Sequence, residues 1–507
     1  MSGVRVRRNG RAMRRDLAAV VLAVSVAACG STVQLRSTAT SGLGGADGLG
    51  SQASTGGAPL GTTGNGPGSS QSGTGPAGSS STGLSSSPGG TTSAAGGASA
   101  TVQGGSSGTV SGATRKAAIR VGVIYTPGAD AAAKAVGISA LSTGDTKAEA
   151  TAVVDWINSH GGLGGHPVDL YSYAIDMSAT SQAAAQQEAC TAMVQDDKVR
   201  YVVSILAQLQ TLTACLAKAG VGLLDDETGL GDKNMATYAA ALGNPGEFAP
   251  GRRVSTLVED LWNHRWLTAG SKVGILAVDN TDAHDAVNGP LTATLRQHGL
   301  TVTKTAYVNP NGGDGGSGAS SNAALAFRAA GVDRVIPVMY SPLYFMETAN
   351  SQRYQPEYAM TSDNGPGALL ETAAPTSQLK GAMGIGWQPF LDIGKGTKPA
   401  PVSARETLCF ALMKKAGQES TSPTVKGFEV QVCNVLFYLK DLADREPAIP
   451  PDLLTSGRRL LGSTFASADT FRTDVSRHTD GVAGYRTLAF QDGCSCFQYV
   501  SGVQATK

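Results

Sequence analysis

The spacing of apolar residues becomes regular at about residue 115 and stays regular to the C-terminus. Short apolar runs of strand length alternate there with stretches whose apolar residues recur at helical spacing. Strands are predicted at 119–126, 167–176, 201–206, 221–225, 272–279, 301–308, 334–340 and 357–363. Helices are predicted at 148–160, 178–197, 209–219, 250–267, 283–298, 320–330, 342–351, 402–416 and 425–441. Apolar and polar residues alternate at 482–500, which predicts a terminal hairpin.

Strands that alternate with helices in this way predict a mostly parallel sheet covered by helices on both faces. The pattern occurs twice, before and after the turn Gly243-Asn244-Pro245-Gly246. The predicted fold class is therefore α/β, with two doubly wound, Rossmann-like lobes. A second break is expected near 381–389, ahead of the last two predicted helices.

Residues 1–28 predict a secretory signal peptide. Six arginines lie before residue 16, and the apolar run that follows at 17–28 is too short to stay in a bilayer as a spanning helix. The run ends in Val-Ala-Ala-Cys29, which resembles the lipobox of bacterial lipoproteins. That resemblance implies that Cys29 carries acyl chains such as palmitate and anchors the chain to the cell membrane. The alternative is an ordinary signal peptide with a chance cysteine.

Residues 29–114 predict a disordered tether. Gly, Ser and Thr make up about two thirds of this segment, and its charged residues are Arg36 and Asp47. Such a segment buries too little apolar surface to offset the chain entropy lost on folding. We expect it to act as a spacer between the membrane and a folded body.

The folded body carries a small negative charge. The chain has 40 Lys and Arg and 39 Asp and Glu, but seven of the basic residues and two of the acidic ones precede residue 115. The body therefore has a net charge of −4 and contains no long basic run. Binding to nucleic acid is not expected.

A turn between the first predicted helix and the second strand has a recognisable pattern. The segment INSHGGLGGHPVDLYSYAID at 157–176, with the helix and strand that follow it, resembles the leucine/isoleucine/valine-type periplasmic binding proteins. In that family an I-N-x-x-G-G-(I/L)-x-G turn leads into the second strand. The resemblance covers about 118–500.

The resemblance implies a type I periplasmic binding protein fold, in which two lobes joined by three crossovers close on a ligand. The crossovers are expected near 243–250, 382–390 and 444–452. Lobe 1 is then expected at 115–246 plus 388–446, and lobe 2 at 247–387 plus 447–507.

Six cysteines follow Cys29, and an exported chain favours disulfides over free thiols. Six cysteines allow fifteen pairings. The predicted pairs are Cys190–Cys215, on helices that flank one strand, Cys409–Cys433, on successive helices, and Cys494–Cys496, in the terminal hairpin. A metal site is not expected, because the C-x-C pair lacks a partner pair at zinc spacing.

Motifs of common enzyme classes are missing from the predicted folded body. From residue 115 on, the sequence contains no G-x-S-x-G, no H-E-x-x-H and no G-x-x-x-x-G-K-[ST]. The glycine cluster at 161–165 leads from a helix into a strand, the reverse of a dinucleotide-binding loop. Neither enzymatic activity nor a cofactor is expected.

Ligands of open α/β sheets bind beyond the carboxyl ends of the strands. Polar and aromatic residues follow the predicted strands there, in loops where helix N-termini favour anionic groups. The predicted ligand-binding residues are Tyr125, Gln208, Leu209, Gln210, Asp226, Asp282, His284, Tyr340, Asp363 and Trp387.

The amino-acid-binding members of the family present small hydroxyl residues after the third strand and a P-A-T-like turn after the fourth. This chain has Ala-Gln-Leu-Gln-Thr at 207–211 and Asp-Asp-Glu-Thr at 225–228 instead. An amide, a polyol or a cationic compound therefore fits no worse than an amino acid.

The expected function is that of a monomeric, extracytoplasmic, lipid-anchored solute-binding protein, which delivers a small polar ligand to an ABC permease. The alternatives are a ligand-sensing or protein-interaction module of the cell envelope without transport, and an inert envelope-structure protein.

Overall fold

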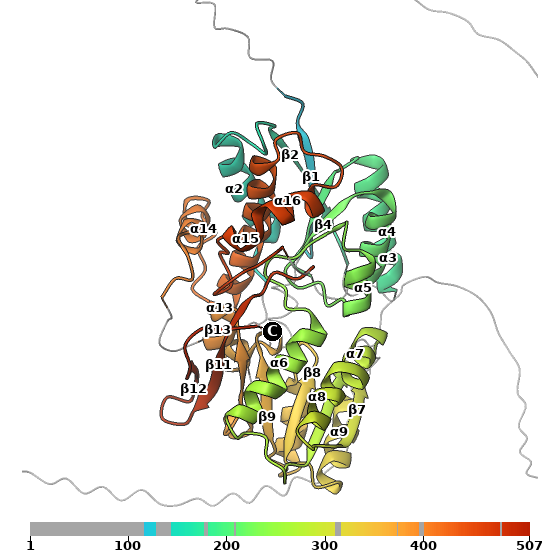
Figure 1. The fold of residues 1–507 in the computed structure, drawn as a ribbon, viewed down its shortest axis with the longest axis vertical. Helices are drawn as coiled ribbons and strands as arrows, with labels where there is room; N and C mark the ends of the chain where they lie inside the picture. The colour runs from blue at the N-terminus through green and yellow to red at the C-terminus, as the bar shows by residue number, and fades with distance from the viewer. Residues whose placement is uncertain are drawn as a thin grey trace, which may run out of the picture. The chain divides into compact units, whose positions relative to one another are not determined.

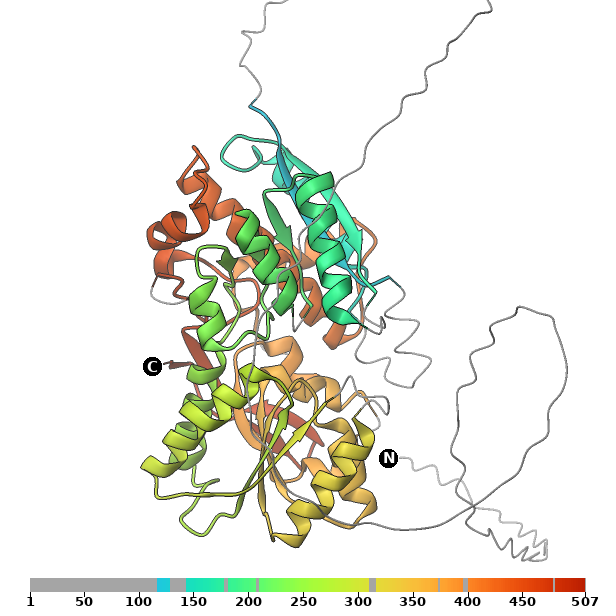
Figure 2. The same cartoon turned by 90° about the vertical axis from the view of Figure 1, so that its right-hand side faces the viewer.

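The structure, a computed structural model, describes residues 116–127, 143–176, 181–206, 209–309, 316–372, 374–394, 400–476 and 479–506. The predicted signal peptide, the lipidation site Cys29, the tether and Gln208 lie outside these residues. The described part of the chain forms two β-sheets with helices on their faces (Figures 1 and 2).

The first sheet is parallel throughout, with strand order β2-β1-β3-β4-β5. Its strands are β1 (Ile119–Tyr125), β2 (Val168–Ala174), β3 (Tyr201–Val203), β4 (Gly222–Leu224) and β5 (Leu242–Gly243). Helices α2 (Thr146–Ser159) and α15 (Pro423–Arg445) cover one face, and α3 (Gln182–Thr191) and α4 (Gln210–Ala219) cover the other.

Alternation along the strands explains why both faces are covered. Val121 and Val123 of β1 belong to the core cluster that contains α2 and α15, whereas Ile124 belongs to the cluster that contains α3 and α4. Successive side chains of a strand point to opposite faces, so an apolar run such as 119–125 requires apolar helices on both sides.

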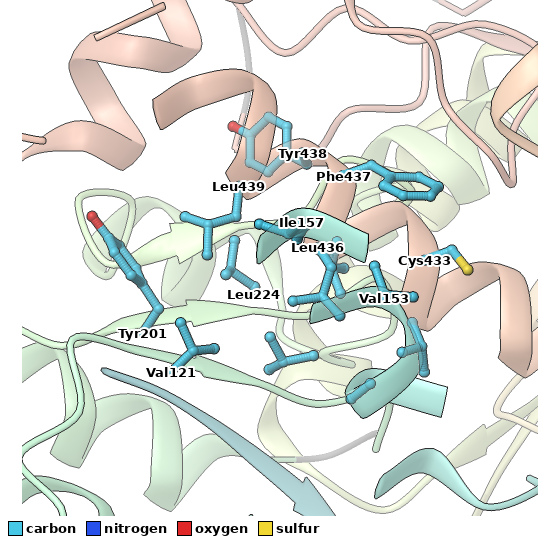
Figure 3. Packing of buried hydrophobic residues seen from close by; sticks show 14 of the residues in the cluster. Val121, Val153, Ile157, Tyr201, Leu224, Cys433, Leu436, Phe437, Tyr438 and Leu439 are labelled. Atoms are coloured by element: carbon cyan, nitrogen blue, oxygen red, sulfur yellow. The ribbon is translucent and has the colours of Figure 1, made fainter. Parts of the chain in front are cut away.

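Helix α15 is the largest single contribution to the first core. It begins with Ser422, whose side chain caps the helix by accepting from the Val425 amide, and with Pro423 in the first turn. Leu436 and Leu439 lie over Val121 and Leu224 of the sheet (Figure 3). A helix from the last quarter of the chain therefore covers one face of a sheet built from residues 119–243.

The second sheet has strand order β12-β11-β10-β9-β8-β6-β7. Strands β6 (Val273–Val278), β7 (Val302–Val308), β8 (Arg334–Val338), β9 (Glu357–Thr361) and β10 (Met383–Gly386) are parallel. Strands β11 (Gly484–Gln491) and β12 (Cys496–Tyr499) add an antiparallel hairpin at β10, and β13 (Gln504–Ala505) pairs with β11. The predicted terminal hairpin is confirmed.

One face of the second sheet packs against α6 (Pro250–Asn263), α7 (Thr281–Ala286) and α8 (Thr292–Gln297), and the other against α9 (Ser317–Ala329) and α10 (Leu343–Ser351). The predicted helix at 283–298 contains a π-helical segment, η3 (Val287–Leu291), which includes Pro290. Proline has no amide hydrogen to donate, so regular α-helical bonding is interrupted there.

Shorter and later elements complete the chain. These are η2 (Ala192–Asp196), α5 (Asp232–Thr237), η4 (Ser362–Asn364), α11 (Pro366–Leu369), α12 (Thr376–Leu379), α13 (Pro389–Ile393), α14 (Ala404–Lys415), α16 (Leu453–Leu461) and η5 (Gly462–Thr464). Within the described residues, no helix combines the length and apolar character that crossing a membrane requires.

The chain's third passage between the sheets lies later than the expected 444–452. Helix α16 was not predicted, and its leucines pack with α15 in the first core cluster, as do Phe465 and Val475. Residues 480–482 then pair with the first crossover, where the Gly481 amide donates to the Asn244 carbonyl (2.9 Å). The predicted lobe 2 segment 447–507 thus begins with residues that pack against the first sheet.

All three predicted disulfides are present: Cys190–Cys215, Cys409–Cys433 and Cys494–Cys496. The first joins α3 to α4 and the second joins α14 to α15. These two link positions separated by 25 and 24 in the sequence, whereas the third closes a ring between positions separated by only 2.

Loop length predicts how much each bridge stabilises the fold. Replacing both cysteines of Cys190–Cys215, or both of Cys409–Cys433, with serine should lower the free energy of unfolding by about 3 kcal/mol, because each bridge restricts the unfolded chain. The Cys494→Ser, Cys496→Ser pair is the control and should cost about half as much, about 1.5 kcal/mol. Urea unfolding of the three double variants measures this, and equal losses in all three would contradict it.

Candidate functional site

A cavity of about 80 Å³ lies where strands of both sheets end. Its walls come from the loops that follow β4, β6, β8 and β9 and from the starts of α6 and α7. This is the carboxyl edge of the parallel strands, where open α/β sheets bind ligands. The lining residues are Glu227, Gly229, Glu247, Pro250, Arg253, Val278, Asn280, Asp282, Ala283, Ala286, Val338, Met339, Tyr340 and Asp363.

Carboxylates dominate the polar part of this wall. Glu227 and Glu247 come from the first-sheet side and the first crossover, and Asp282 and Asp363 come from the second-sheet side. Arg253, in the first turn of α6, forms an ion pair with Asp363. The cleft therefore holds more negative than positive groups.

Local hydrogen bonds fix the two glutamates. Glu247 is only 4% exposed, and its Oε2 accepts from the Thr228 amide (2.8 Å) and the Thr228 hydroxyl (3.3 Å). The Glu227 amide donates to Oδ1 of Asp225 (2.8 Å), which holds the turn after β4. These bonds orient the Glu247 carboxylate and the backbone that carries Glu227.

Burial raises the pKa of Glu227 well above its usual value, and repulsion from Asp363 and Asp225 raises it further. Burial likewise raises the pKa of Glu247, as does the charge of Asp363. The Arg253 guanidinium lowers the pKa of both. A positive group in the cleft thus favours the ionised form of both glutamates.

Tyr340 connects the two halves of the site. It follows β8 of the second sheet, yet its ring packs against the core cluster under the first sheet. Burial raises the pKa of its hydroxyl, as do the charges of Glu227 and Asp363. The side chain therefore reaches across the cavity as a neutral aromatic wall with a polar end.

Three of the ten predicted ligand-binding residues line the cavity, namely Asp282, Tyr340 and Asp363. Asp282 lies in the first turn of α7, and its Oδ1 accepts from the Asn234 side chain (2.8 Å). The three come from different loops of the second sheet, which the fold brings together.

Three other predicted residues are buried away from the cavity. Leu209 is in the core beside α4, and Trp387 packs edge-on against Phe248 in the second core. Asp226 uses both carboxylate oxygens inside the protein, since Oδ1 accepts from the Gly246 amide and Oδ2 from the Asn434 side chain (2.6 Å each).

The remaining predicted residues do not line the cavity either. Tyr125, at the end of β1, lies beneath the Lys147 ammonium (5.7 Å), and Gln210 begins α4. His284 stacks on Tyr307 and contacts Asp279 (2.9 Å). Gln208 is outside the described residues.

Sequence reasoning did not single out Glu247 and Arg253. Both follow the first crossover, in Gly246-Glu247-Phe248-Ala249-Pro250-Gly251-Arg252-Arg253, a segment that looks like the approach to a helix and not like a strand end. The signal available was a glutamate and two arginines close to a predicted crossover. A crossover between lobes lies at the cleft by construction, so its charged residues are candidates too.

A second set of buried carboxylates lies where the crossovers meet. The Gln388 side-chain amide donates to Asp469 (2.7 Å), and Asp392 accepts from the Tyr499 hydroxyl and from the backbone N–H of Gln388. Burial raises the pKa of Asp392 to about 7, against the lowering effect of the Tyr499 hydroxyl. Within the described part of the chain, no three acidic, histidine or cysteine side chains form a group that could hold a metal ion.

No family model and no curated protein matches this chain, but solved structures do match it in fold. A solute-binding protein of an ABC transporter from Rhodopseudomonas palustris, in complex with 4-hydroxybenzoate, has a TM-score of 0.55 at 13% identity and covers 77% of this chain and 98% of its own. The branched-chain amino acid transporter substrate-binding protein of Streptococcus pneumoniae, in complex with isoleucine, has a TM-score of 0.54 at 14% identity, covering 76% and 99%.

A substrate-binding periplasmic protein from Ralstonia solanacearum gives a TM-score of 0.54 at 17% identity, covering 73% of this chain and 97% of its own. At such identities the likeness is one of fold. It confirms the α/β fold class predicted from the sequence.

The raised pKa of Asp392 predicts that stability falls as the pH rises. The ordinary pKa of an aspartate is 3.8 and that of Asp392 in the folded chain is about 7, so the folded chain holds an extra proton between those values. The stabilisation present below pH 4 is then lost as the pH rises to 7, by about 4 kcal/mol. Asp392→Asn, which cannot ionise, should remove this share of the pH dependence.

Urea unfolding of the full chain at several pH values between 4 and 8 measures the effect. Asp285→Asn, at an exposed position on α7, is the control and should follow the unsubstituted chain. A pH dependence in Asp392→Asn as steep as in the control would contradict the prediction.

Proposed function

Because the chain has the type I periplasmic binding protein fold, we propose that it is an extracytoplasmic solute-binding protein that closes two lobes on a small polar ligand. The observation that carries the proposal is the cavity at the carboxyl edge of both sheets, whose wall combines carboxylates, a tyrosine and apolar groups. A few oriented polar groups in a mostly apolar recess are typical of small-molecule sites.

The size of the cavity favours a small ligand. Sites for drug-sized molecules span roughly 300–1,000 Å³, whereas this cavity holds about 80 Å³. A compound of few heavy atoms fits the arrangement described, and a larger one requires the lobes to separate further.

We extend the proposal to delivery of the ligand to an ABC permease by a lipid-anchored monomer. Two features support it: the lipobox-like Val-Ala-Ala-Cys29 after an apolar run, and the fold shared with solved proteins that are transporter components by name. The role is binding and not catalysis, and it involves neither a cofactor nor nucleic acid. The described lobes would then stand on the 29–114 segment as a tether.

The site predicts a specific loss of ligand binding in Tyr340→Ala. A thermal-shift screen of the purified chain with amino acids, amides, polyamines and sugars should identify a stabilising ligand. Tyr340→Ala should weaken its binding by about tenfold or more, because the ring is a half-buried aromatic wall of the cavity. The control is Tyr344→Ala, on α10, whose side chain is 45% exposed and does not line the cavity.

Small-angle scattering with and without the ligand tests lobe closure. If no compound class raises the melting temperature and scattering detects no closure, the solute-binding proposal is wrong. Equal weakening by Tyr340→Ala and Tyr344→Ala would place the ligand elsewhere on the chain.

A transport experiment tests permease delivery separately. Deleting the gene for this protein should reduce cellular uptake of the identified ligand. A Cys29→Ser variant should fail to restore uptake, because that protein is no longer held at the membrane. Ligand binding without any uptake defect would favour a sensing or interaction module of the cell envelope. Metabolic labelling with a palmitate analogue should mark the unsubstituted chain and not Cys29→Ser.

A further inference from the structure

The cleft cavity has an unbalanced charge. Four carboxylates line it, from Glu227, Glu247, Asp282 and Asp363, and Arg253 is the one basic side chain among its described lining residues. Arg253 is already occupied, because it pairs with Asp363. Asp282 accepts from a neutral amide, that of Asn234, and forms no ion pair among the described residues.

Two of these carboxylates also present oxygens without a partner. Oε2 of Glu247 accepts two bonds from Thr228, but within the described residues Oε1 has no hydrogen bond or ion pair, although the residue is almost fully buried. The Glu227 carboxylate likewise has neither among the described residues. Both residues line the cavity, and these oxygens are not sealed in the protein interior, so a ligand in the cavity can donate to them.

We propose that this cleft selects a small organic cation, a primary amine or guanidinium compound with a short apolar stem; the inference rests on the solute-binding function proposed above. The cation donates hydrogen bonds to Glu227 and to Oε1 of Glu247, and its positive charge offsets the excess of carboxylates. Charge-assisted bonds of this kind are about twice as strong as neutral ones.

Charge also argues against an anionic ligand. Helix N-termini at a cleft usually attract anions through their free amides. Here three of the amides around the starts of α6 and α7 are already used: Ala249 donates to Asp480 (2.9 Å), Gly251 to Asp232 (3.3 Å) and Ala283 to Asn280 (2.8 Å). A carboxylate ligand would find these three donors occupied, and it would face four acidic side chains and an arginine that is already paired.

The other side of the cavity suits the apolar stem. Val278, Ala283, Ala286 and Val338 line it, together with the Tyr340 ring. An aromatic face also attracts a cation directly. The four carboxylates come from different segments of the chain, so they fit an organic cation with spaced donors.

Calorimetric titration of the full chain with four related probes tests the inference. Putrescine is the cation, butanediol its neutral counterpart, succinate its anionic counterpart and leucine a zwitterion. Putrescine should bind at least about tenfold more tightly than the other three, because each of them lacks a positive charge or carries a negative one.

Two conservative variants link the selectivity to the named carboxylates. Glu227→Gln and Glu247→Gln should each weaken putrescine binding about tenfold, since each removes one charge and keeps the side-chain shape. Binding of butanediol should change little. Asp285→Asn, which removes a charge from α7 outside the cavity, is the matched control and should leave the putrescine affinity within about twofold.

Melting curves of the ligand-free variants verify folding, and if Glu247→Gln loses its contacts with Thr228 and unfolds, Glu227→Gln alone decides. Tighter binding of leucine, succinate or butanediol than of putrescine would overturn the cation assignment and leave the solute-binding proposal standing. So would unchanged putrescine affinity in a folded Glu227→Gln. A cleft that binds no compound of any class contradicts the solute-binding function itself.

Discussion

The geometry of the cleft depends on one buried carboxylate, that of Asp226. Its two oxygens accept from the Gly246 amide and the Asn434 side chain, so it joins the end of β4, the first crossover and the centre of α15. The Asn434 side-chain oxygen in turn accepts from Ser467 and Ala468, on the way to the third passage between the sheets. Segments from opposite halves of the chain are thereby fixed around one point.

Burying the Asp226 carboxylate costs free energy, and this cost bears on ligand binding. Burial raises the pKa of Asp226 to about 7, because hydrogen bonds to Asn434 and Gly246 only partly offset the loss of water. The next residue is Glu227, whose carboxylate faces the cavity without a partner among the described residues. Tethering β4 through Asp226 therefore presents Glu227 to the cleft, and a cationic ligand would offset part of the cost of burying these groups.

The sequence predicted the fold well and the site only in part, for physical reasons. Apolar runs such as 119–126 dictate strands locally, and their two-sided burial dictates helices on both faces, so α/β layering follows from short-range pattern. The strand-end residues Tyr340 and Asp363 could be named on the same basis. Helix α16 was missed although Leu453, Leu454 and Leu461 recur at helical spacing; what no local pattern could supply was its packing against α15.

Glu247 and Arg253 were not predicted as site residues because long-range contacts place them. Their position is set by the first crossover and by contacts with residues 480–482, which the chain reaches only near its C-terminus. Conversely, Asp226 looked like a ligand group because it follows a strand, yet long-range partners turn it inward. The ends of the strands therefore predict where the cleft lies. Hydrogen bonds from distant segments decide which of its carboxylates remain available to a ligand. In this chain they leave Glu227 and one oxygen of Glu247 facing the cavity, and that difference between neighbouring acids gives the site its chemical character.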